Sequence, residues 1–402
     1  MDATTRARVA GLAALVFLIL GSYAVARPAI ESLFLSEHGA DALPQAWLGV
    51  ALGSLLVVTI YNHWAARTDL IVLFGAASLI SAVCVAVLLS CHAQGLPGSA
   101  FLLYLWKDIY IVVLIEIFWS FANSNIPKDK AQRIYGLFCV LGSLGGMAGN
   151  LLVGFLATWL GTAASLWAVI PLLLISAGGC ALISRHFPAK RAAAKPASGL
   201  LEGFQVLRNS RTLWLLMALI ATSQVVITLI DYQMNMALEA HYPDTDARTA
   251  VIGQIYAAID TASIALQLGT SVILRLLGVG AVLLLIPSLL GAAVAAYAAV
   301  PKFAAMATAK VASKAFDYSL FRAAKEILYI PLSHSERTQG KAFVDMCSYR
   351  VAKGACSLLL LGLVAWGSPG WVVMATMVGI GIWVGVTLAL RTKTVGKVES
   401  PW

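Results

Sequence analysis

The sequence predicts an all-α membrane protein with twelve transmembrane helices arranged in two six-helix halves. Hydrophobic residues make up 60% of the 402 residues and charged residues only 12%, with a mean hydropathy of +0.85. A soluble domain carries about 25% charged residues. Apolar runs of about twenty residues, enough to cross a bilayer, recur along the whole chain. The basic residues are also distributed unevenly between the two sides of the predicted spans.

Twelve apolar runs are expected to cross the bilayer as helices. A transmembrane β-barrel would instead show short segments of alternating polarity, and none is visible. The expected spans lie at residues 9–34, 45–65, 70–91, 99–123, 134–158, 162–184, 212–238, 249–274, 277–299, 302–332, 342–366 and 369–390.

With these spans drawn, nearly all basic loop residues fall on one side of the membrane. The opposite loops carry only Arg248 and Lys302. The positive-inside rule then places both termini in the cytoplasm of a multi-pass protein of the bacterial inner membrane. The net charge of +9 is explained by this topology, so no nucleic-acid partner is predicted. The residues on the basic side are Arg6, Arg8, Arg67, Lys128, Lys130, Arg133, those of the 185–211 linker, Arg275, Arg337, Lys341, Arg391, Lys393 and Lys397.

The linker at 185–211 divides the chain into an N-terminal half, residues 1–184, and a C-terminal half, residues 212–402. It is basic and alanine-rich, and its stretch G-L-L-E-G-F-Q-V-L predicts a short amphipathic helix on the inner membrane surface. The six cysteines have no paired spacing, and the six histidines are scattered, none with Asp or Glu at metal-ligand spacing. We therefore expect no disulfide, no metal and no cofactor.

The stretch Lys310–Leu332 carries an unusual density of charge for a membrane span. Each charge facing lipid near the bilayer centre would cost ~2.5–3.5 kcal/mol or more, so these side chains must face one another, water or a ligand. At 100° per residue, one stripe would carry Lys310, Lys314, Asp317, Phe321 and Lys325, with Tyr318, Arg322 and Glu326 on its flank.

Other expected spans also carry charges. Arg27 and Glu31 are one helical turn apart, and Glu116 follows Trp106 and Lys107 in the fourth span. Two readings stay open for such groups: pairing that only stabilises the bundle, or contact with a solute or coupling proton. The same choice applies to Asp231 and Asp260 in the seventh and eighth spans.

Glycines in the fifth span have interleaved G-x-x-x-G spacing. They are Gly142, Gly145, Gly146 and Gly149. No lysine with Ser or Thr follows and no strand precedes, so a phosphate loop is excluded. The pattern predicts close packing of two helices.

Three segments of the sequence resemble one another. Tyr23-x3-Arg27-x3-Glu31 matches Tyr318-x3-Arg322-x3-Glu326, and Glu116-Ile-Phe-Trp matches Glu326-Ile-Leu-Tyr. Helices one, four and ten therefore look like copies of one unit. Nested three-helix repeats in a six-plus-six chain are the layout of major facilitator transporters, in which helices one, four, seven and ten line a central cavity.

The segment KAFDYSLFRAAKEILYIPL, with GKAFVD after it, resembles the bacterial and plastid ATP/ADP translocase family. FWSFANSN and AQRIYGLF in the first half resemble further motifs of that family. The resemblance implies a major facilitator-like fold and transport of nucleotides or related anions by exchange or proton coupling. It also implies that Arg27, Lys325 and Glu326 match the family's charged positions.

Three positions depart from the family pattern. Ile30 and Asp317 stand where the family has lysines, and Arg322 where it has an aspartate. Because a triphosphate needs several cations, the solute predicted is a polar, anionic organic molecule, nucleotide-like or other.

The sequence thus predicts a secondary active transporter that works by alternating access, as a monomer, with a proton or counter-substrate as coupling partner. The alternatives are a lipid or lysolipid flippase of the same fold and a membrane-embedded transferase; the scattered histidines disfavour an enzyme. The predicted substrate-binding residues are Arg27, Trp106, Lys107, Lys314, Tyr318, Phe321, Arg322 and Lys325, and the predicted coupling or gating residues are Glu31, Glu116, Asp231, Asp260, Asp317 and Glu326.

Overall fold

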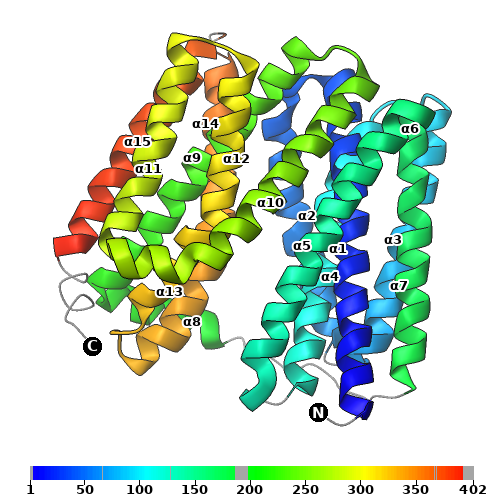
Figure 1. Cartoon of the computed structure of the whole chain (residues 1–402), viewed down its shortest axis with the longest axis horizontal. Helices are drawn as coiled ribbons and strands as arrows, with labels where there is room; N and C mark the ends of the chain where they lie inside the picture. The colour runs from blue at the N-terminus through cyan, green and yellow to red at the C-terminus, as the bar shows by residue number, and fades with distance from the viewer. Residues whose placement is uncertain are drawn as a thin grey trace. The chain divides into compact units, whose positions relative to one another are not determined.

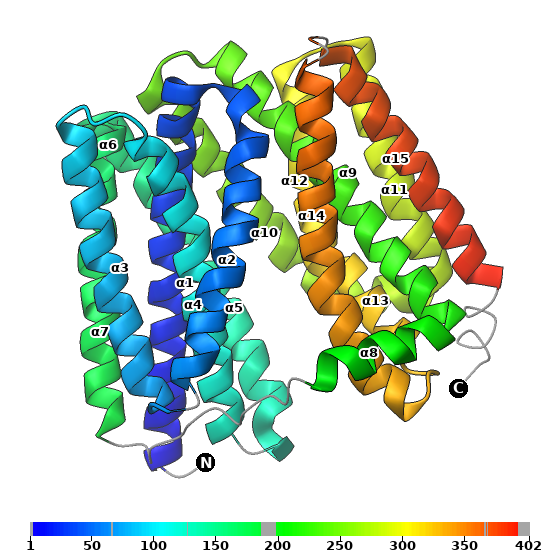
Figure 2. The same cartoon turned by 180° about the vertical axis from the view of Figure 1, so that it is seen from behind.

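The structure is a computed structural model that describes residues 3–65, 67–126, 128–185, 198–365, 367 and 369–392. Within these ranges the chain consists of helices joined by short turns and contains no strand (Figures 1 and 2). The all-α prediction is therefore confirmed for the described residues. The linker residues 186–197 and the tail residues Lys393 and Lys397, both used in the topology prediction, lie outside them.

Helical segments occupy each range expected to span the membrane before the linker. They are α1 (Ala3–His38), α2 (Leu43–Ala65), α3 (Leu70–Ala93), α4 (Ser99–Asn125) and α5 (Lys128–Leu160), then α6 (Thr162–Ser165), a 3₁₀ turn (Leu166–Ala168) and α7 (Val169–Ser184). Glycines with positive φ separate several of these helices: Gly39, Gly95, Gly98 and Gly161.

After the linker the pattern repeats. The helices are α8 (Ser198–Asn209), α9 (Arg211–His241), α10 (Thr245–Leu277), α11 (Val279–Ala299), α12 (Phe303–Phe316), α13 (Arg322–Tyr329), α14 (Lys341–Ala365) and α15 (Pro369–Leu390). Helix α8 lies at the expected amphipathic helix.

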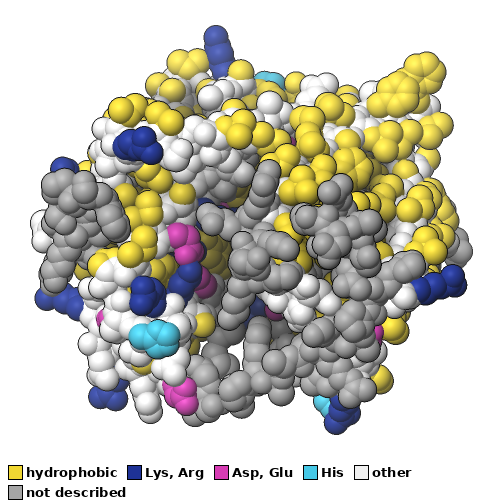
Figure 3. Space-filling view, turned by 60° about the horizontal axis from the view of Figure 1, so that its bottom comes forward, with side chains coloured by type: hydrophobic (Ala, Val, Ile, Leu, Met, Phe, Trp, Pro, Cys, Tyr) yellow, Lys and Arg dark blue, Asp and Glu magenta, His cyan; other side chains and the backbone are white. Residues whose placement is uncertain are grey.

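Ten helical segments of the described chain are long and apolar enough to cross a membrane. The expected spans at 99–123 and 302–332 are not among them. Helix α4 carries Lys107, Asp108 and Glu116, and the 303–329 segment is interrupted and highly charged. Large apolar side chains such as Leu52, Ile80 and Trp159 are exposed, and hydrophobic patches are broad in Figure 3. These exposed side chains suit a lipid environment.

The chain forms two compact units. Unit 1 consists of Met1–Ala42, Gly49–Ala194 and Tyr242–Asp260, and unit 2 of Leu43–Leu48, Lys195–His241 and Thr261–Trp402. The predicted division at 185–211 stays a prediction, since residues 186–197 of that linker lie outside the described residues.

Within unit 1, α1 packs against α4, α5 and α7, and α3 packs against α4 and α7. Glycines make the α1–α5 contact very close. A Cβ at Gly145 or Gly149 would collide with the α1 backbone at Phe17 or Gly21. The glycine spacing therefore does what its pattern predicted, which is to bring two helix backbones together.

Within unit 2, α9 packs against α12, α14 and α15, and α11 packs against α12 and α15. Helix α8 contacts the turn before α14: Gln339 donates to Glu202 (3.0 Å), and Ser210 donates to Glu336. Phe204 and Phe343 add an aromatic contact.

The charged segment of unit 2 is not one continuous α-helix. Asp317–Phe321 forms a π-helical turn between α12 and α13, and a second π turn covers Glu336–Gly340. A π turn takes more residues per turn than an α-helix, so the faces before and after it no longer align. The stripe expected from Lys310 to Lys325 assumed an unbroken 100° period, which the π turn interrupts, so that stripe stays a prediction.

Candidate functional site

In unit 1, three charged side chains of α1 and α4 form a buried cluster around Lys107. The Lys107 side chain is 2% exposed; its Nζ lies 2.9 Å from Asp108 Oδ1 and 3.7 Å from Glu31 Oε1. Tyr23 donates a hydrogen bond to the same Asp108 oxygen (3.2 Å). A buried ammonium needs such partners, and this one has two carboxylates.

Arg27, on α1 between Tyr23 and Glu31, stacks on aromatic rings. Its guanidinium carbon lies 3.3 Å from the Tyr256 ring centroid and 5.0 Å from that of Tyr23. The Tyr256 hydroxyl donates to Glu31 (3.1 Å to Oε2). Tyr256 thus contacts both Arg27 and Glu31 and fixes the geometry of this part of α1.

The predicted aromatic contact Trp106 stacks on Tyr110, with ring centroids 4.3 Å apart and planes inclined by 13°. The Trp106 indole N–H is buried and has no hydrogen-bond partner among the described residues. Glu116 lies on the same helix and is half-buried. Among the described residues, Trp106 is therefore a stacked aromatic side chain whose buried indole N–H makes no hydrogen bond.

Asp260 of unit 1 lies against α5. Asn150 donates to Asp260 Oδ2 (2.9 Å), and a Cβ at Gly146 would lie 3.1 Å from the same oxygen. The absence of a side chain at Gly146 therefore makes room for the carboxylate. Arg248 lies on α10, the helix that also carries Asp260. Its side chain is 2% exposed and donates hydrogen bonds to the Oγ and the backbone oxygen of Ser32 (3.2 and 3.3 Å).

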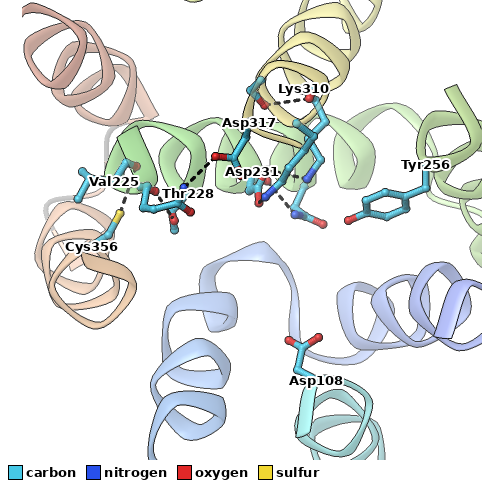
Figure 4. A network of polar contacts seen from close by, with 12 residues as sticks. Asp108, Val225, Thr228, Asp231, Tyr256, Lys310, Asp317 and Cys356 are labelled. Carbon is cyan, nitrogen blue, oxygen red and sulfur yellow. Dashed lines mark hydrogen bonds and ion pairs between the residues drawn. The ribbon is translucent and has the colours of Figure 1, made fainter. Parts of the chain in front are cut away.

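In unit 2, two lysines share one aspartate. Lys310 Nζ lies 2.7 Å from Asp231 Oδ1, and Lys314 Nζ lies 3.0 Å from Asp231 Oδ2 (Figure 4). The lysines are one turn apart on α12, which places them on the same face, and α9 supplies the aspartate. Lys310 was not among the predicted binding residues, although it lies in the charged stretch.

The π turn places its own residues beside this cluster. Gln224 of α9 donates to Asp317 Oδ1 (3.2 Å), the contact drawn in Figure 4, and Gln267 donates to the backbone oxygen of Tyr318 (3.4 Å). Asp317 therefore adds a second carboxylate near Lys314.

The residues of α13 face different surroundings. Lys325 is 7% exposed at its side chain and pairs with Asp345 of α14 (2.9 Å). Glu326 is exposed and pairs with Lys341. Arg322 is exposed and forms no hydrogen bond or ion pair with any residue that the structure describes.

Phe321 lies in the core of unit 2. It is 1% exposed and packs edge-to-face on Trp383 of α15, with ring centroids 5.7 Å apart. In this conformation it stabilises the helix packing, and a solute contact by Phe321 stays a prediction.

Sequence reasoning missed several partners that the structure supplies. Asp108 directly follows Lys107, and Asp345 ends the G-K-A-F-V-D motif, so both could have been chosen from local pattern. Tyr256 had no such signal, because it reaches Arg27 and Glu31 only through tertiary packing within unit 1, to which residues 242–260 belong. No group of three or more His, Cys, Asp or Glu in the described residues is placed to hold a metal ion.

Comparison with known sequences links the chain to nucleotide carriers. Residues 303–393 match the model of the TLC ATP/ADP transporter family. ADP,ATP carrier protein 2, chloroplastic, of Arabidopsis thaliana is 24% identical over 89% of this chain and 69% of its own length. ADP,ATP carrier protein 1 of Chlamydia muridarum is 26% identical over 65% of this chain and 58% of its own, and carrier protein 5 of Rickettsia conorii is 26% identical over 63% and 60%. The alignments with the two bacterial relatives thus span less than two thirds of those proteins.

Comparison with solved structures identifies the fold. A bacterial homologue of the iron transporter ferroportin, in an inward-facing state, matches with a TM-score of 0.74 and 12% identity, covering 98% of this chain and 100% of that one. The nucleoside transporter NupG matches with a TM-score of 0.67 and 13% identity, covering 96% and 98%. The chain has the helical fold of major facilitator-type transporters, and the resemblance predicted from its motifs is confirmed.

Proposed function

We propose, from the premise that this multi-pass membrane protein is a distant relative of the TLC ATP/ADP transporters, that it is a secondary active transporter of a nucleotide-like organic anion. Its relatives are carriers and its fold is a transporter fold, so an enzymatic role has no support.

The observation that carries the proposal is the pair of lysines on Asp231. Inside a bundle of apolar helices, this places two ammonium groups against one carboxylate, with Asp317 as a second carboxylate near Lys314. Such a concentration of buried charge is typical of a pathway or binding site for a charged solute. The exposed Arg322 lies two turns further along the same segment and adds a guanidinium, which binds carboxylate or phosphate in bidentate fashion.

The transport mechanism proposed is alternating access of two six-helix halves, with twelve spans in total. Helices α4 and α12–α13 would be the two spans whose charges make them less apolar than the others, because their polar side chains line the pathway. Both termini would be cytoplasmic in the bacterial inner membrane, and the protein would act as a monomer.

Carboxylates on the same helices suit a coupling role. Glu31, Glu116, Asp260 and Asp317 could accept a coupling proton, whereas exchange against a counter-substrate would need no titrating group. The relatives named as ADP,ATP carriers favour exchange.

Counter-flow in proteoliposomes tests the function. Vesicles preloaded with unlabelled adenine nucleotide should accumulate labelled nucleotide, and vesicles loaded with adenosine alone should not. Lys314→Gln should abolish the accumulation. Lys302→Gln is the matched control, since Lys302 precedes α12 outside the cluster, and it should leave accumulation intact. Absence of accumulation with every anionic solute tested would reject the proposal.

A further inference from the structure

We propose that the Asp231 carboxylate is an internal stand-in for the anionic group of the solute. The solute then carries one terminal phosphate or carboxylate group, which takes the place of Asp231 between Lys310 and Lys314. The inference rests on the proposed function and specifies the class of solute.

The geometry of the cluster is that of a built oxyanion site. Each lysine holds a different oxygen, Lys310 at 2.7 Å from Oδ1 and Lys314 at 3.0 Å from Oδ2. A terminal phosphate or an organic carboxylate presents a similar pair of oxygens to two donors. A solute group can therefore replace the aspartate without moving the two lysines far.

Replacement of Asp231 by a solute group requires one buried lysine and a more accessible lysine and aspartate, and the three side chains differ in exposure in this way. The Lys310 side chain is 5% exposed, whereas those of Lys314 and Asp231 are 18% and 20% exposed. Lys310 is the fixed end of the site. Lys314 and Asp231 lie at its accessible side, where a solute can enter and the aspartate can leave.

The charges of the surrounding helices set how much negative charge the site accepts. Lys353 lies on α14 one turn before Cys356, whose Sγ contacts the Val225 carbonyl of α9 (3.7 Å; Figure 4), so Lys353 is on the side of α14 that faces α9. Its Nζ lies 5.8 Å from the Trp47 ring centroid. The charged side chains that interact with this cluster or with its members are Asp231 on α9, Lys310 and Lys314 on α12, Asp317 in the π turn, Arg322 and Lys325 on α13, and Asp345 and Lys353 on α14. The other charges of α13 and α14 are left out of this set, because Glu326 and Lys341 pair with each other and Arg350 is exposed.

Among these groups the cations exceed the carboxylates by two. A single phosphate monoester brings about −1.5 to −2 charges near pH 7, which this excess neutralises. A triphosphate chain brings more negative charge than the excess can neutralise, and Asp231 and Asp317 would repel the remainder. The set of charges therefore favours a solute with one anionic group.

Ligand affinity of the purified protein, measured with adenosine and its mono-, di- and triphosphate, tests the inference. The wild type should bind the monophosphate about tenfold or more tightly than the triphosphate, and adenosine more weakly than the monophosphate. Asp231→Asn removes the competing carboxylate and one negative charge, so it should raise triphosphate affinity about fivefold or more relative to monophosphate.

Asp317→Asn is the matched control because it changes the net charge equally but leaves the Lys310–Asp231–Lys314 contacts in place. It should shift the ratio less than Asp231→Asn does. Lys310→Gln should weaken all three phosphates. A melting temperature measured without ligand shows whether each variant is folded, and Asp231→Glu keeps the carboxylate if Asp231→Asn is unstable; it should retain the wild-type ranking.

The outcomes separate this inference from the proposed function. Tightest binding of the triphosphate by wild type, or an equal shift in the Asp231→Asn and Asp317→Asn variants, would overturn the stand-in role while leaving anion transport intact. Failure of all three phosphates to bind, together with failure of counter-flow with every anion, would reject the proposed function itself.

Discussion

Two stretches of this protein share one sequence pattern and differ in nearly everything else. Tyr23, Arg27 and Glu31 lie on the uninterrupted helix α1 of unit 1, whereas Tyr318, Arg322 and Glu326 straddle a π turn and α13 of unit 2. Glu31 is 8% exposed and is bonded by Tyr256. Glu326 is exposed and pairs only with Lys341 among the described residues.

The comparison shows that the Tyr-x3-Arg-x3-Glu spacing places its three side chains in equivalent positions only when the α-helix is uninterrupted. On α1, spacings of four keep three side chains on one face, where α4 and α10 supply their partners. The π turn changes the helical register between α12 and α13, and Arg322 is exposed whereas Lys310 is buried beside Asp231. One copy of the pattern belongs to a buried cluster of paired charges. The other presents the exposed Arg322, which forms no ion pair with the residues that the structure describes.

The sharpest test of this comparison replaces the lysine partner of each glutamate. Lys107→Met should lower the free energy of unfolding by ~3–5 kcal/mol, because it leaves Asp108 and Glu31 buried without their ammonium. Lys341→Met, on the exposed pair with Glu326, should cost ~1 kcal/mol or less. Denaturation in mixed detergent micelles measures both. Equal losses would contradict the contrast between a buried and an exposed cluster.

A smaller effect is expected at the two arginines. Arg27→Lys loses the guanidinium stacking on Tyr256 and should destabilise the protein by ~1–2 kcal/mol. Arg322→Lys should change stability by less than ~0.5 kcal/mol yet weaken solute binding, because lysine cannot bind an oxyanion in bidentate fashion. Thermal unfolding with and without solute measures both effects, and a destabilised Arg322→Lys variant with unchanged affinity would show that Arg322 is structural.

The smallest effect concerns the tyrosine hydroxyls. Tyr23→Phe removes the hydrogen bond to Asp108 and should cost ~0.5–1.5 kcal/mol. Tyr318→Phe removes a hydroxyl that forms no hydrogen bond with the described residues, and it should change stability by less than ~0.5 kcal/mol. The same unfolding assay compares them. A loss at Tyr318 as large as that at Tyr23 would mean that its hydroxyl has a stabilising partner in solution.

Much of the fold followed from local pattern. The apolar runs correctly located helices as different as α3 and α11, since a bilayer demands long apolar segments with internal hydrogen bonds. The spacing of Gly145 and Gly149 correctly predicted a close helix contact, because only missing side chains allow it. The site was predicted less completely. The sequence pointed to Lys314 and Asp231 separately, as charges that need partners, without indicating that they pair with each other.

The sequence by itself determined that this is a helical membrane protein, where its helices lie, which family it resembles and which buried charges require explanation. These properties depend on composition and on patterns within one helix. Only the tertiary structure decided that Lys310 and Lys314 share Asp231, that Tyr256 holds Arg27 and Glu31, and that Phe321 lies against Trp383. Those contacts join helices far apart in the chain, and a five-residue π turn, which no hydrophobic pattern reveals, sets which faces meet.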